Sequence, residues 1–337
     1  MNNLDLDVLA SELLRAVRGK RSQRAFSRRL GYRTNIAYTW ESGRSFPTAA
    51  KAFAAAERAG VDTAAGIARF FGAAPPWLAR ASLGTPEGVV QLLGELRAGR
   101  TIVEIARSAG RSRFAVARWL QGDAEPRLPD FLRLVDVCSL RLLDFLATLV
   151  DPRALPSARA AWKQLETRRR AAYEVPWSQA VLLALELRAY EELPRHRDGW
   201  IAERIGITPK EERECLALLE RTGQIHLVGR KYAIAPSRTV DTRRDPKAAH
   251  QVKVWWSQRA VERLELGAPG PSSYNLFTVS APDLERLREL HRAYFQQMRA
   301  IVAASQPCER LVLACAQMLD LSVQPAPAIS GGSPAPA

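Results

Sequence analysis

Four polar side chains near the start of one short predicted helix are the clearest candidates for contacts with an external partner. The helix is expected from about Arg33 to Ser42, and Ile36 and Trp40 form its apolar face. The polar residues that this pattern leaves exposed are Thr34, Asn35, Tyr38 and Thr39. An asparagine amide can donate to and accept from one base edge at once, as with N6 and N7 of adenine. These residues therefore indicate recognition by hydrogen bonding.

Catalytic chemistry has less support, because the familiar active-site motifs are missing from the sequence. There is no phosphate-binding loop, no GxGxxG, GxSxG or HExxH motif, and no acidic cluster at two-metal spacing. The reactive side chains that remain share no motif; they are His250, His291, Cys308 and Cys315. His250 is the first to test, although a hydrogen bond at a helix start is its simpler interpretation. We therefore expect no enzyme activity, no catalytic residue, no cofactor and no metal site.

The overall charge indicates a polyanionic partner. The 337 residues include 49 Lys and Arg against 35 Asp and Glu, a formal net charge of +14. Such an excess favours nucleic acid or an acidic membrane surface. Nine basic residues and a single acidic one, Glu41, lie between Arg15 and Arg44. Neither a signal peptide nor an apolar stretch of membrane-spanning length is present, so we expect a cytoplasmic protein with no membrane partner.

Part of the sequence repeats at an offset of 79 residues. The residues Gly31, Trp40, Gly43 and Pro47 recur as Gly110, Trp119, Gly122 and Pro126. In the same register Leu13, Leu14, Arg18, Arg21 and Ser22 match Leu92, Leu93, Arg97, Arg100 and Thr101. The sequence therefore predicts two copies of one unit, over residues 1–82 and 83–152.

Each copy predicts two short helices around a tight turn. In the first copy Ser22 is suited to cap a helix over Gln23–Leu30, and Gly31 can take the left-handed conformation that ends it. The second helix follows at once and carries the polar groups described above. This is the geometry of a helix-turn-helix, which presents side chains to the major groove.

The first copy resembles the Xre-type, lambda-repressor-like helix-turn-helix over residues 11–60. The resemblance rests on Ser22-Gln23, Phe26-Ser27, Gly31, Trp40-Glu41, Gly43 and Pro47. It implies that Gln23 and Arg44 contact phosphates and that Thr34, Asn35 and Thr39 reach base edges. From their positions we add Tyr38 to the base contacts and Arg33 to the phosphate contacts.

The second copy, similar to the same family in weaker form over residues 89–150, has a different surface. Ile102 replaces the glutamine and Leu120 the glutamate, and the net charge over residues 85–135 is only +2. The arginines that would contact DNA here are Arg111, Arg113 and Arg118. Exposed Ile102 and Phe114 would suit a protein interface equally well, and both alternatives stay open.

The following segment predicts a helical linker over residues 153–175 and a winged-helix-like domain over residues 176–246. The expected elements are helices over 177–192, 200–205 and 209–221 and a hairpin over 225–234 that turns at Gly229. The third helix has a net charge of −1, which a phosphate-lined groove would repel. Only Arg230 and Lys231 in the wing suit DNA, so we favour a scaffold or dimer contact.

The last ordered segment, residues 247–322, predicts a small α+β domain for dimerisation or sensing. Strands are expected over 274–279 and 311–318. Its long helix has an apolar stripe formed by Leu284, Leu287, His291, Tyr294, Met298 and Ile301. Residues 323–337 are rich in Pro, Ala, Ser and Gly and predict a disordered tail.

Residues 160–322 resemble an uncharacterised bacterial family in which a winged helix precedes a C-terminal domain of unknown function. The matching segments are Trp200-Ile201-Ala202, Leu218-Leu219, Gly223-Gln224-Ile225, Ala249-His250-Gln251, Leu276–Ser280 and Leu311–Leu321. The resemblance implies a regulator-like protein.

The whole sequence predicts a mainly α protein with tandem helix-turn-helix bundles, a winged helix and a small α+β C-terminal domain. We expect a sequence-specific transcriptional regulator that binds double-stranded DNA, forms a homodimer and responds to an unknown effector or protein partner. One chain could cover two adjacent half-sites, or two chains could bind a palindrome. The alternative is an adaptor, polymerase-binding or antitoxin-like, whose helix-turn-helix units bind protein.

Overall fold

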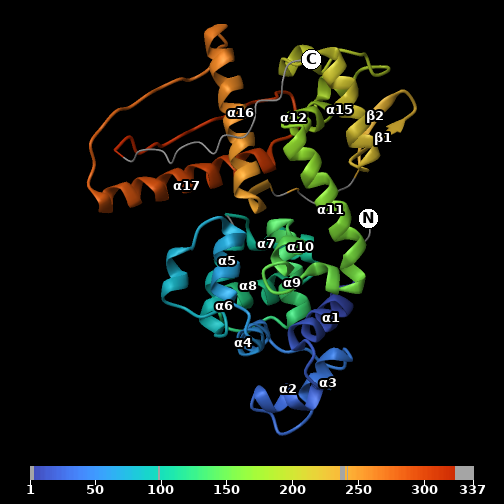
Figure 1. The fold of residues 1–337 in the computed structure, drawn as a ribbon, viewed down its shortest axis with the longest axis vertical. Helices are drawn as coiled ribbons and strands as arrows, with labels where there is room; N and C mark the ends of the chain where they lie inside the picture. The colour runs from blue at the N-terminus through green and yellow to red at the C-terminus, as the bar shows by residue number, and fades with distance from the viewer. Residues whose placement is uncertain (1–3, 98, 236–239, 241, 323–337) are drawn as a thin grey trace.

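The computed structural model describes residues 4–97, 99–235, 240 and 242–322, and this part of the chain is mainly helical (Figure 1). It contains seventeen α-helices, three short 3-10 helices and one two-stranded antiparallel sheet. The predicted mainly α class is confirmed at this level. None of the described helices is both long and apolar enough to cross a membrane. The predicted disordered tail lies outside the described residues.

Two series of helices with the same order form the N-terminal body. The first series is α1 (Leu6–Arg18), α2 (Gln23–Arg29), α3 (Ile36–Glu41) and α4 (Ala49–Ala59). The second series is α6 (Pro86–Arg97), α7 (Ile102–Ala109), α8 (Arg113–Gln121) and α9 (Leu128–Ser139). The intervening and closing elements are α5 (Thr63–Phe71), η1 (Pro76–Ala79), α10 (Leu142–Leu146) and η2 (Pro152–Ala154). The sequence repeat is therefore also a repeat of helices.

Two equivalent hydrogen bonds join the two series. The Leu128 N–H donates to the Pro47 carbonyl at 2.9 Å, and the Ala49 N–H donates to the Pro126 carbonyl at 3.0 Å. Pro47 and Pro126 are 79 residues apart in the sequence, as are Ala49 and Leu128. Because each bond is the counterpart of the other, the two series meet as the halves of a two-fold dimer do.

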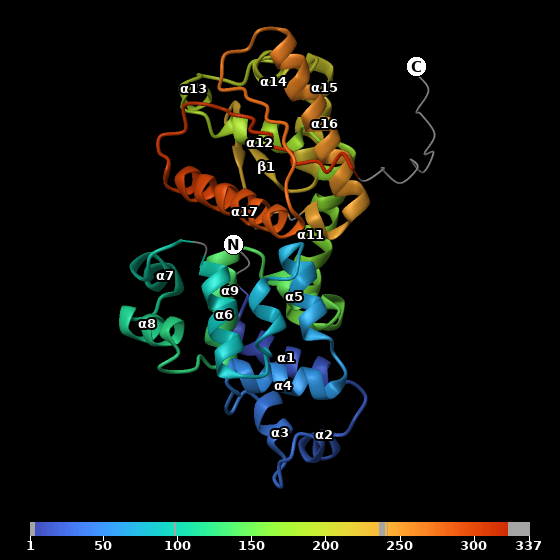
Figure 2. The ribbon, with the colours of Figure 1, turned by 90° about the vertical axis from the view of Figure 1, so that its left-hand side faces the viewer.

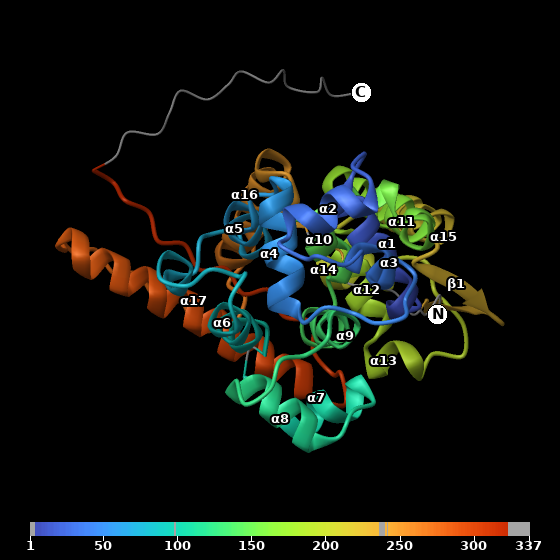
Figure 3. The ribbon, with the colours of Figure 1, turned by 90° about the horizontal axis from the view of Figure 1, so that it is seen from below.

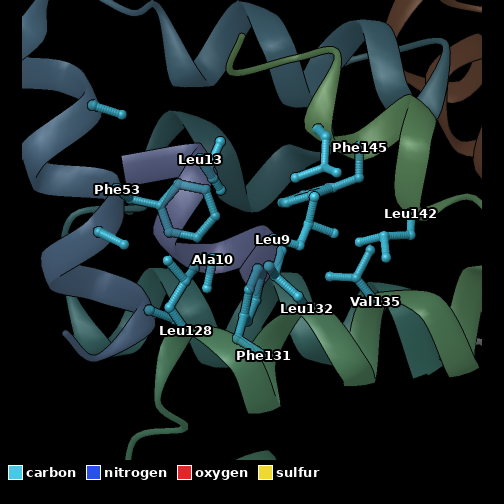
Figure 4. Close-up of a cluster of buried hydrophobic side chains, with 14 of the residues drawn as sticks. Leu9, Ala10, Leu13, Phe53, Leu128, Phe131, Leu132, Val135, Leu142 and Phe145 are labelled. Atoms are coloured by element: carbon cyan, nitrogen blue, oxygen red, sulfur yellow. The ribbon is translucent and has the colours of Figure 1, made fainter. Parts of the chain in front are cut away.

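The two series also share one hydrophobic core (Figure 4). The Phe53 ring of the first series lies 5.4 Å from the Phe131 ring of the second, and both rings pack edge-on or tilted against Phe145. Leu9 and Leu13 of α1 enter the same cluster. Aromatic rings in such arrangements contribute more than their buried area alone. The two series therefore stabilise each other.

Helix α11 (Pro156–Glu174) connects the N-terminal body to the C-terminal half (Figure 1). The buried Arg169 guanidinium donates to the Asp144 carboxylate of α10 at 2.6 Å. The neighbouring Arg168 turns the other way and donates to the Gly223 carbonyl at 2.6 Å. Two residues of the basic run in the predicted linker therefore anchor the two halves of the molecule.

The C-terminal half begins with a small helical unit and a hairpin. Its elements are α12 (Ser178–Leu185), α13 (Arg188–Glu191), α14 (Ala202–Ile205), α15 (Pro209–Arg221), β1 (Ile225–Val228) and β2 (Lys231–Ile234). In the hairpin Ile225 pairs with Ile234, and Gly229 turns the chain with φ +61°. The helix predicted over 177–192 is wrong as a continuous element. The Arg188 N–H donates to the Cys308 carbonyl at 2.8 Å, so a distant segment of the chain takes a donor that a continuous helix would use.

The last part of the chain contains η3 (Thr242–Arg244), α16 (Pro246–Glu265) and α17 (Ala281–Ala304). The strands predicted over 274–279 and 311–318 are not formed, because both runs lack a ladder partner within the residues described. Leu276 and Val312 remain 78% and 77% exposed. A β-branched or apolar run favours an extended chain, but a strand also needs a paired edge. The predicted α+β domain is therefore wrong at this point.

Candidate nucleic-acid interface

Helices α2 and α3 lie at one end of the molecule, far from the C-terminal half (Figures 1 and 2). Local signals in the sequence form them. The Ser22 hydroxyl accepts a hydrogen bond from the Ala25 N–H at 3.2 Å and caps α2. Gly31 has φ +89° at the turn that follows, a conformation that strongly favours glycine. The end of the molecule is therefore a short pair of helices with a fixed turn.

The second helix of this pair starts later than the sequence predicts. It begins at Ile36 instead of Arg33, because the Ile36 N–H donates to the Thr34 carbonyl in a tight turn at 2.9 Å. Arg33 and Thr34 are exposed in that turn, and Asn35 is half-buried at the cap position. The turn therefore places these three predicted contact residues at the N-terminal end of α3.

The remaining predicted contact residues follow along α3 and just beyond it. Tyr38 is 43% exposed, Thr39 is half-buried and Arg44 is exposed. The Arg44 guanidinium lies 5.1 Å from the centre of the Tyr38 ring. These two side chains therefore form one continuous surface.

Asn35 is restrained by the residues beneath it. The Ser27 hydroxyl accepts a hydrogen bond from the Ala37 N–H at 3.0 Å and donates to the Gln23 carbonyl at 2.7 Å. The same hydroxyl oxygen lies 3.3 Å from Oδ1 of Asn35. A side chain held in this way loses little conformational freedom when it binds a partner.

A buried glutamate joins the two helices to α1. The Glu41 side chain is 3% exposed and accepts two hydrogen bonds from Arg18, at 2.6 and 3.0 Å. The Gln23 amide donates to it at 2.9 Å, and Arg15 lies at 3.7 Å. The hydrogen bond to Glu41 raises the pKa of Arg18. Sequence reasoning did not assign this cluster, and it leaves Gln23 one free amide N–H for the predicted phosphate contact.

The surface around α2 and α3 is strongly basic. Of the nine basic residues between Arg15 and Arg44, eight are exposed. Seven of these have no ion pair within the part of the chain that the structure describes; they are Lys20, Arg21, Arg24, Arg28, Arg29, Arg33 and Arg44. Unpaired guanidinium groups on one end of a protein are suited to phosphate oxygens.

The equivalent surface of the second series is different. Helix α7 begins with a capping box in which Thr101 and Glu104 bond to each other's backbone, and these bonds lower the pKa of Glu104. Next to it, Val103 and Phe114 are 54% and 70% exposed. Figures 2 and 3 show α7 and α8 well separated from α2 and α3.

The predicted DNA contacts of the second series already have neighbours within the chain. Arg111 donates to Asp130 at 2.7 Å, and the Arg113 guanidinium lies 5.3 Å from the Phe114 ring centre. Arg118 donates to the Asp123 carbonyl at 3.5 Å. Of these three arginines Arg111 is ion-paired, whereas Arg113 and Arg118 are exposed.

A comparison by position shows how far the charge has changed. The eight exposed basic residues of the first series correspond, 79 residues later, to Gly94, Gly99, Arg100, Val103, Arg107, Ser108, Ser112 and Asp123. Two of these are basic and one is acidic, so a local charge of +8 falls to +1. The fold is repeated, but the basic surface is not.

The hairpin in the C-terminal half carries two basic residues, of which Arg230 is exposed. Lys231 donates to the Glu191 carbonyl at 2.6 Å, and the Arg230 carbonyl accepts from the His196 N–H at 2.7 Å. Beneath the hairpin the fully buried Glu212 accepts from the Ala202 N–H at 2.6 Å and lies 3.5 Å from His196. This unit is built from internal contacts.

The side chains considered for catalysis do not converge. His250 is exposed on the second turn of α16, and Asp245, not His250, caps that helix. His291 packs against Phe295 on α17. Within the described ranges no group of three His, Cys, Asp or Glu side chains could hold a metal ion.

The comparisons with known proteins concern only the C-terminal half. No curated protein and no solved structure matches the chain. Residues 157–320, from α11 to the end of the described chain, match the family described as a domain of unknown function (DUF4423). This match supports the predicted resemblance of that segment to a family of unknown function.

Proposed function

We propose that the chain is a sequence-specific DNA-binding transcriptional regulator whose α2 and α3 act as a helix-turn-helix. The observation that carries the proposal is the cluster of seven exposed basic side chains around α3 that have no ion pair within the described residues. Because this cluster lies at the end of the molecule, a duplex can approach it without contacting the C-terminal half (Figure 1). Release of counterions from the duplex would supply much of the affinity.

Two sets of side chains would have separate roles in this complex. Arg33, Arg44 and the free N–H of Gln23 would bind phosphates and fix the position of α3. Thr34, Asn35, Tyr38 and Thr39 would face the base edges from the N-terminal end and one side of α3. The half-buried position of Asn35 against Ser27 supports a defined orientation of its amide.

The second series would act differently from the first. Its exposed Phe114 and Val103 favour a protein interface over a DNA groove, as in the adaptor alternative. The reciprocal bonds between Pro47 and Leu128 and between Ala49 and Pro126 would let it serve as a fixed support for the first series.

The C-terminal half would pair two chains. We interpret α12, α14, α15 and the hairpin as a winged helix that serves as a scaffold. Apolar side chains of α17 and of the segments around it are exposed. Those more than half exposed include Tyr274, Leu276, Leu290, Tyr294, Ile301, Val302, Val312, Leu319 and Leu321. A second copy could cover this face in an isologous contact, and two chains would then bind a palindromic site.

Pairing can be tested by sedimentation of the full chain. We expect a dimer that the substitution Ile301→Asp converts to a monomer, whereas Val254→Asp on α16 leaves it dimeric. A native chain that sediments as a monomer at about 100 μM would contradict the pairing, because the dissociation constants of stable protein interfaces lie well below this concentration.

The salt dependence of binding tests the function itself. With about six phosphate contacts, the logarithm of the affinity of the full chain for a labelled duplex should fall with the logarithm of salt concentration with a slope near −5. An adaptor that binds a protein through apolar contacts would respond little to salt. Absence of duplex binding at low salt, or a slope near zero, would contradict the proposal.

A further inference from the structure

A cavity lies where the N-terminal body meets the C-terminal half. Its volume is about 350 Å³, within the range that small-molecule sites occupy. The cavity is lined by residues 147–153, which follow α10 and reach into η2, by Trp162 of α11 and by Arg244 of η3. Segments from both halves therefore meet around one cavity.

Arg244 supplies an available cation in this wall. Its guanidinium stacks on Trp162 at 4.3 Å from the ring centre. Stacking uses the face of the guanidinium and leaves the N–H donors at its edge, which are arranged to bind a carboxylate. No carboxylate lies within ion-pair distance of Arg244 in the described chain. Loss of solvent and then repulsion from Arg169 lower the pKa of Arg244, whereas Asp144 and Glu166 act in the opposite direction.

The other charged groups limit the charge of a ligand. Arg153 belongs to the same wall, but it pairs with Glu166 at 3.1 Å. The Asp151 carboxylate also lines the cavity, where it accepts a hydrogen bond from the Arg153 N–H at 3.0 Å. The two guanidinium groups and the two carboxylates cancel in formal charge, so one negative charge on a ligand is favoured over two or three.

Apolar side chains also line the cavity, although most of its exposed lining is polar. Leu149, Val150 and Pro152 line the cavity beside the stacked pair of Arg244 and Trp162. The Thr148 hydroxyl donates to the Phe145 carbonyl at 2.7 Å, so its proton is already used within the chain. A small ligand with both polar and apolar atoms would fit this part of the cavity.

We propose that this cavity binds a small organic monoanion that carries one carboxylate. The carboxylate would accept hydrogen bonds from the edge of Arg244, and the rest of the ligand would lie against Leu149 and Val150. Because residues from both halves line the site, binding would fix the position of η3 relative to η2. The proposal does not depend on DNA binding.

Fluorine NMR of the full chain tests this site. The probes are 4-fluorobenzoate and its uncharged analogue 4-fluorobenzamide, which differ in the group that Arg244 would bind. We expect the benzoate signal to broaden when protein is added and the benzamide signal to stay sharp. Equal broadening of both signals, or no broadening of the benzoate signal, would overturn the proposal.

Two variants and a control locate the binding. Arg244→Gln, which keeps a polar side chain of similar length, should weaken benzoate binding at least tenfold, and Val150→Phe should do the same by filling the cavity. Arg170→Gln changes an exposed arginine on α11 outside the cavity wall and should have no effect. Circular dichroism of each variant checks its fold. Native affinity in both cavity variants would overturn the assignment of the site.

Discussion

The two helical series of the N-terminal body have the same order of helices. Different contacts hold the second helix of each pair, and different side chains cover the surface. In the first series Glu41 binds Arg18 and Gln23 in a buried polar cluster. In the second, Leu120 and Ile102 stand at the positions of Glu41 and Gln23 and pack against the shared core.

This difference shows which residues the fold requires. Gly31 and Gly110 both have positive φ at the turn, and Trp40 and Trp119 both pack against the core. Either a polar cluster or apolar contacts can then hold the second helix. The surface is free to change, and only the first series has a surface suited to phosphate.

Removing charge from each series in turn should give the largest effect. The triple variant Arg24→Gln, Arg28→Gln, Arg33→Gln should weaken duplex binding about 100-fold, since three charge-assisted contacts contribute about 1 kcal/mol each. The matched triple variant Arg107→Gln, Arg113→Gln, Arg118→Gln in the second series should change affinity less than about threefold. Fluorescence anisotropy at fixed salt measures both. Equal losses in the two variants would show that both series bind DNA.

The equivalent positions 35 and 114 distinguish base reading from surface packing. Asn35→Ala should weaken binding to the preferred duplex about 30-fold, or about 2 kcal/mol, and should relax the preference at one base pair. Arg44→Gln should weaken binding to all duplexes alike, and Phe114→Ala should leave affinity unchanged. If Asn35→Ala and Arg44→Gln behaved identically on every duplex, the assignment of Asn35 to a base would be wrong.

The Glu41 cluster should contribute more to the free energy of unfolding than Leu120, its apolar counterpart in the second series. Glu41→Leu copies the second series and should lower the free energy of unfolding by about 2 kcal/mol, because Arg18 and Gln23 lose charge-assisted hydrogen bonds in a poorly solvated place. Leu120→Ala, at a half-buried side chain, should cost about 1 kcal/mol. Urea unfolding measures both. An unchanged stability of Glu41→Leu would mean that the cluster serves only to orient Gln23.

The smallest expected effect is on the rate at which a thiol reagent labels the buried cysteines. Burial raises the pKa of the Cys138 thiol in α9 to about 11, and that of Cys215 in α15 to about 12. Because these pKa values lie above pH 8, both groups stay protonated and unreactive there. We expect iodoacetamide at pH 8 to label the exposed Cys315 well before either of them, as mass spectrometry can show. Fast labelling of Cys138 would indicate that α9 opens readily.

Local signals made part of the fold predictable from the sequence. The Thr208 capping box and Gly229 set the bounds of α15 and of the hairpin, and both elements lie where the sequence predicts them. The mainly α class follows from the same helical patterns. These features depend on residues close together in the chain.

The features that the sequence did not predict depend on distant contacts. The break before Arg188 needs the Cys308 carbonyl, and the Glu41 cluster needs Arg18 from another helix. The cavity at Arg244 needs segments that are about 90 residues apart in the chain. The apolar runs over 274–279 and 311–318 show the reverse case, because a local strand preference was present and a partner strand was not.

Selection from a random duplex library with the full native chain tests the central claim most directly. If α3 reads base edges, the selected duplexes should share one motif, and the Asn35→Ala chain should select the same motif with one position relaxed. A native chain that enriches no motif, even at low salt, would contradict the account.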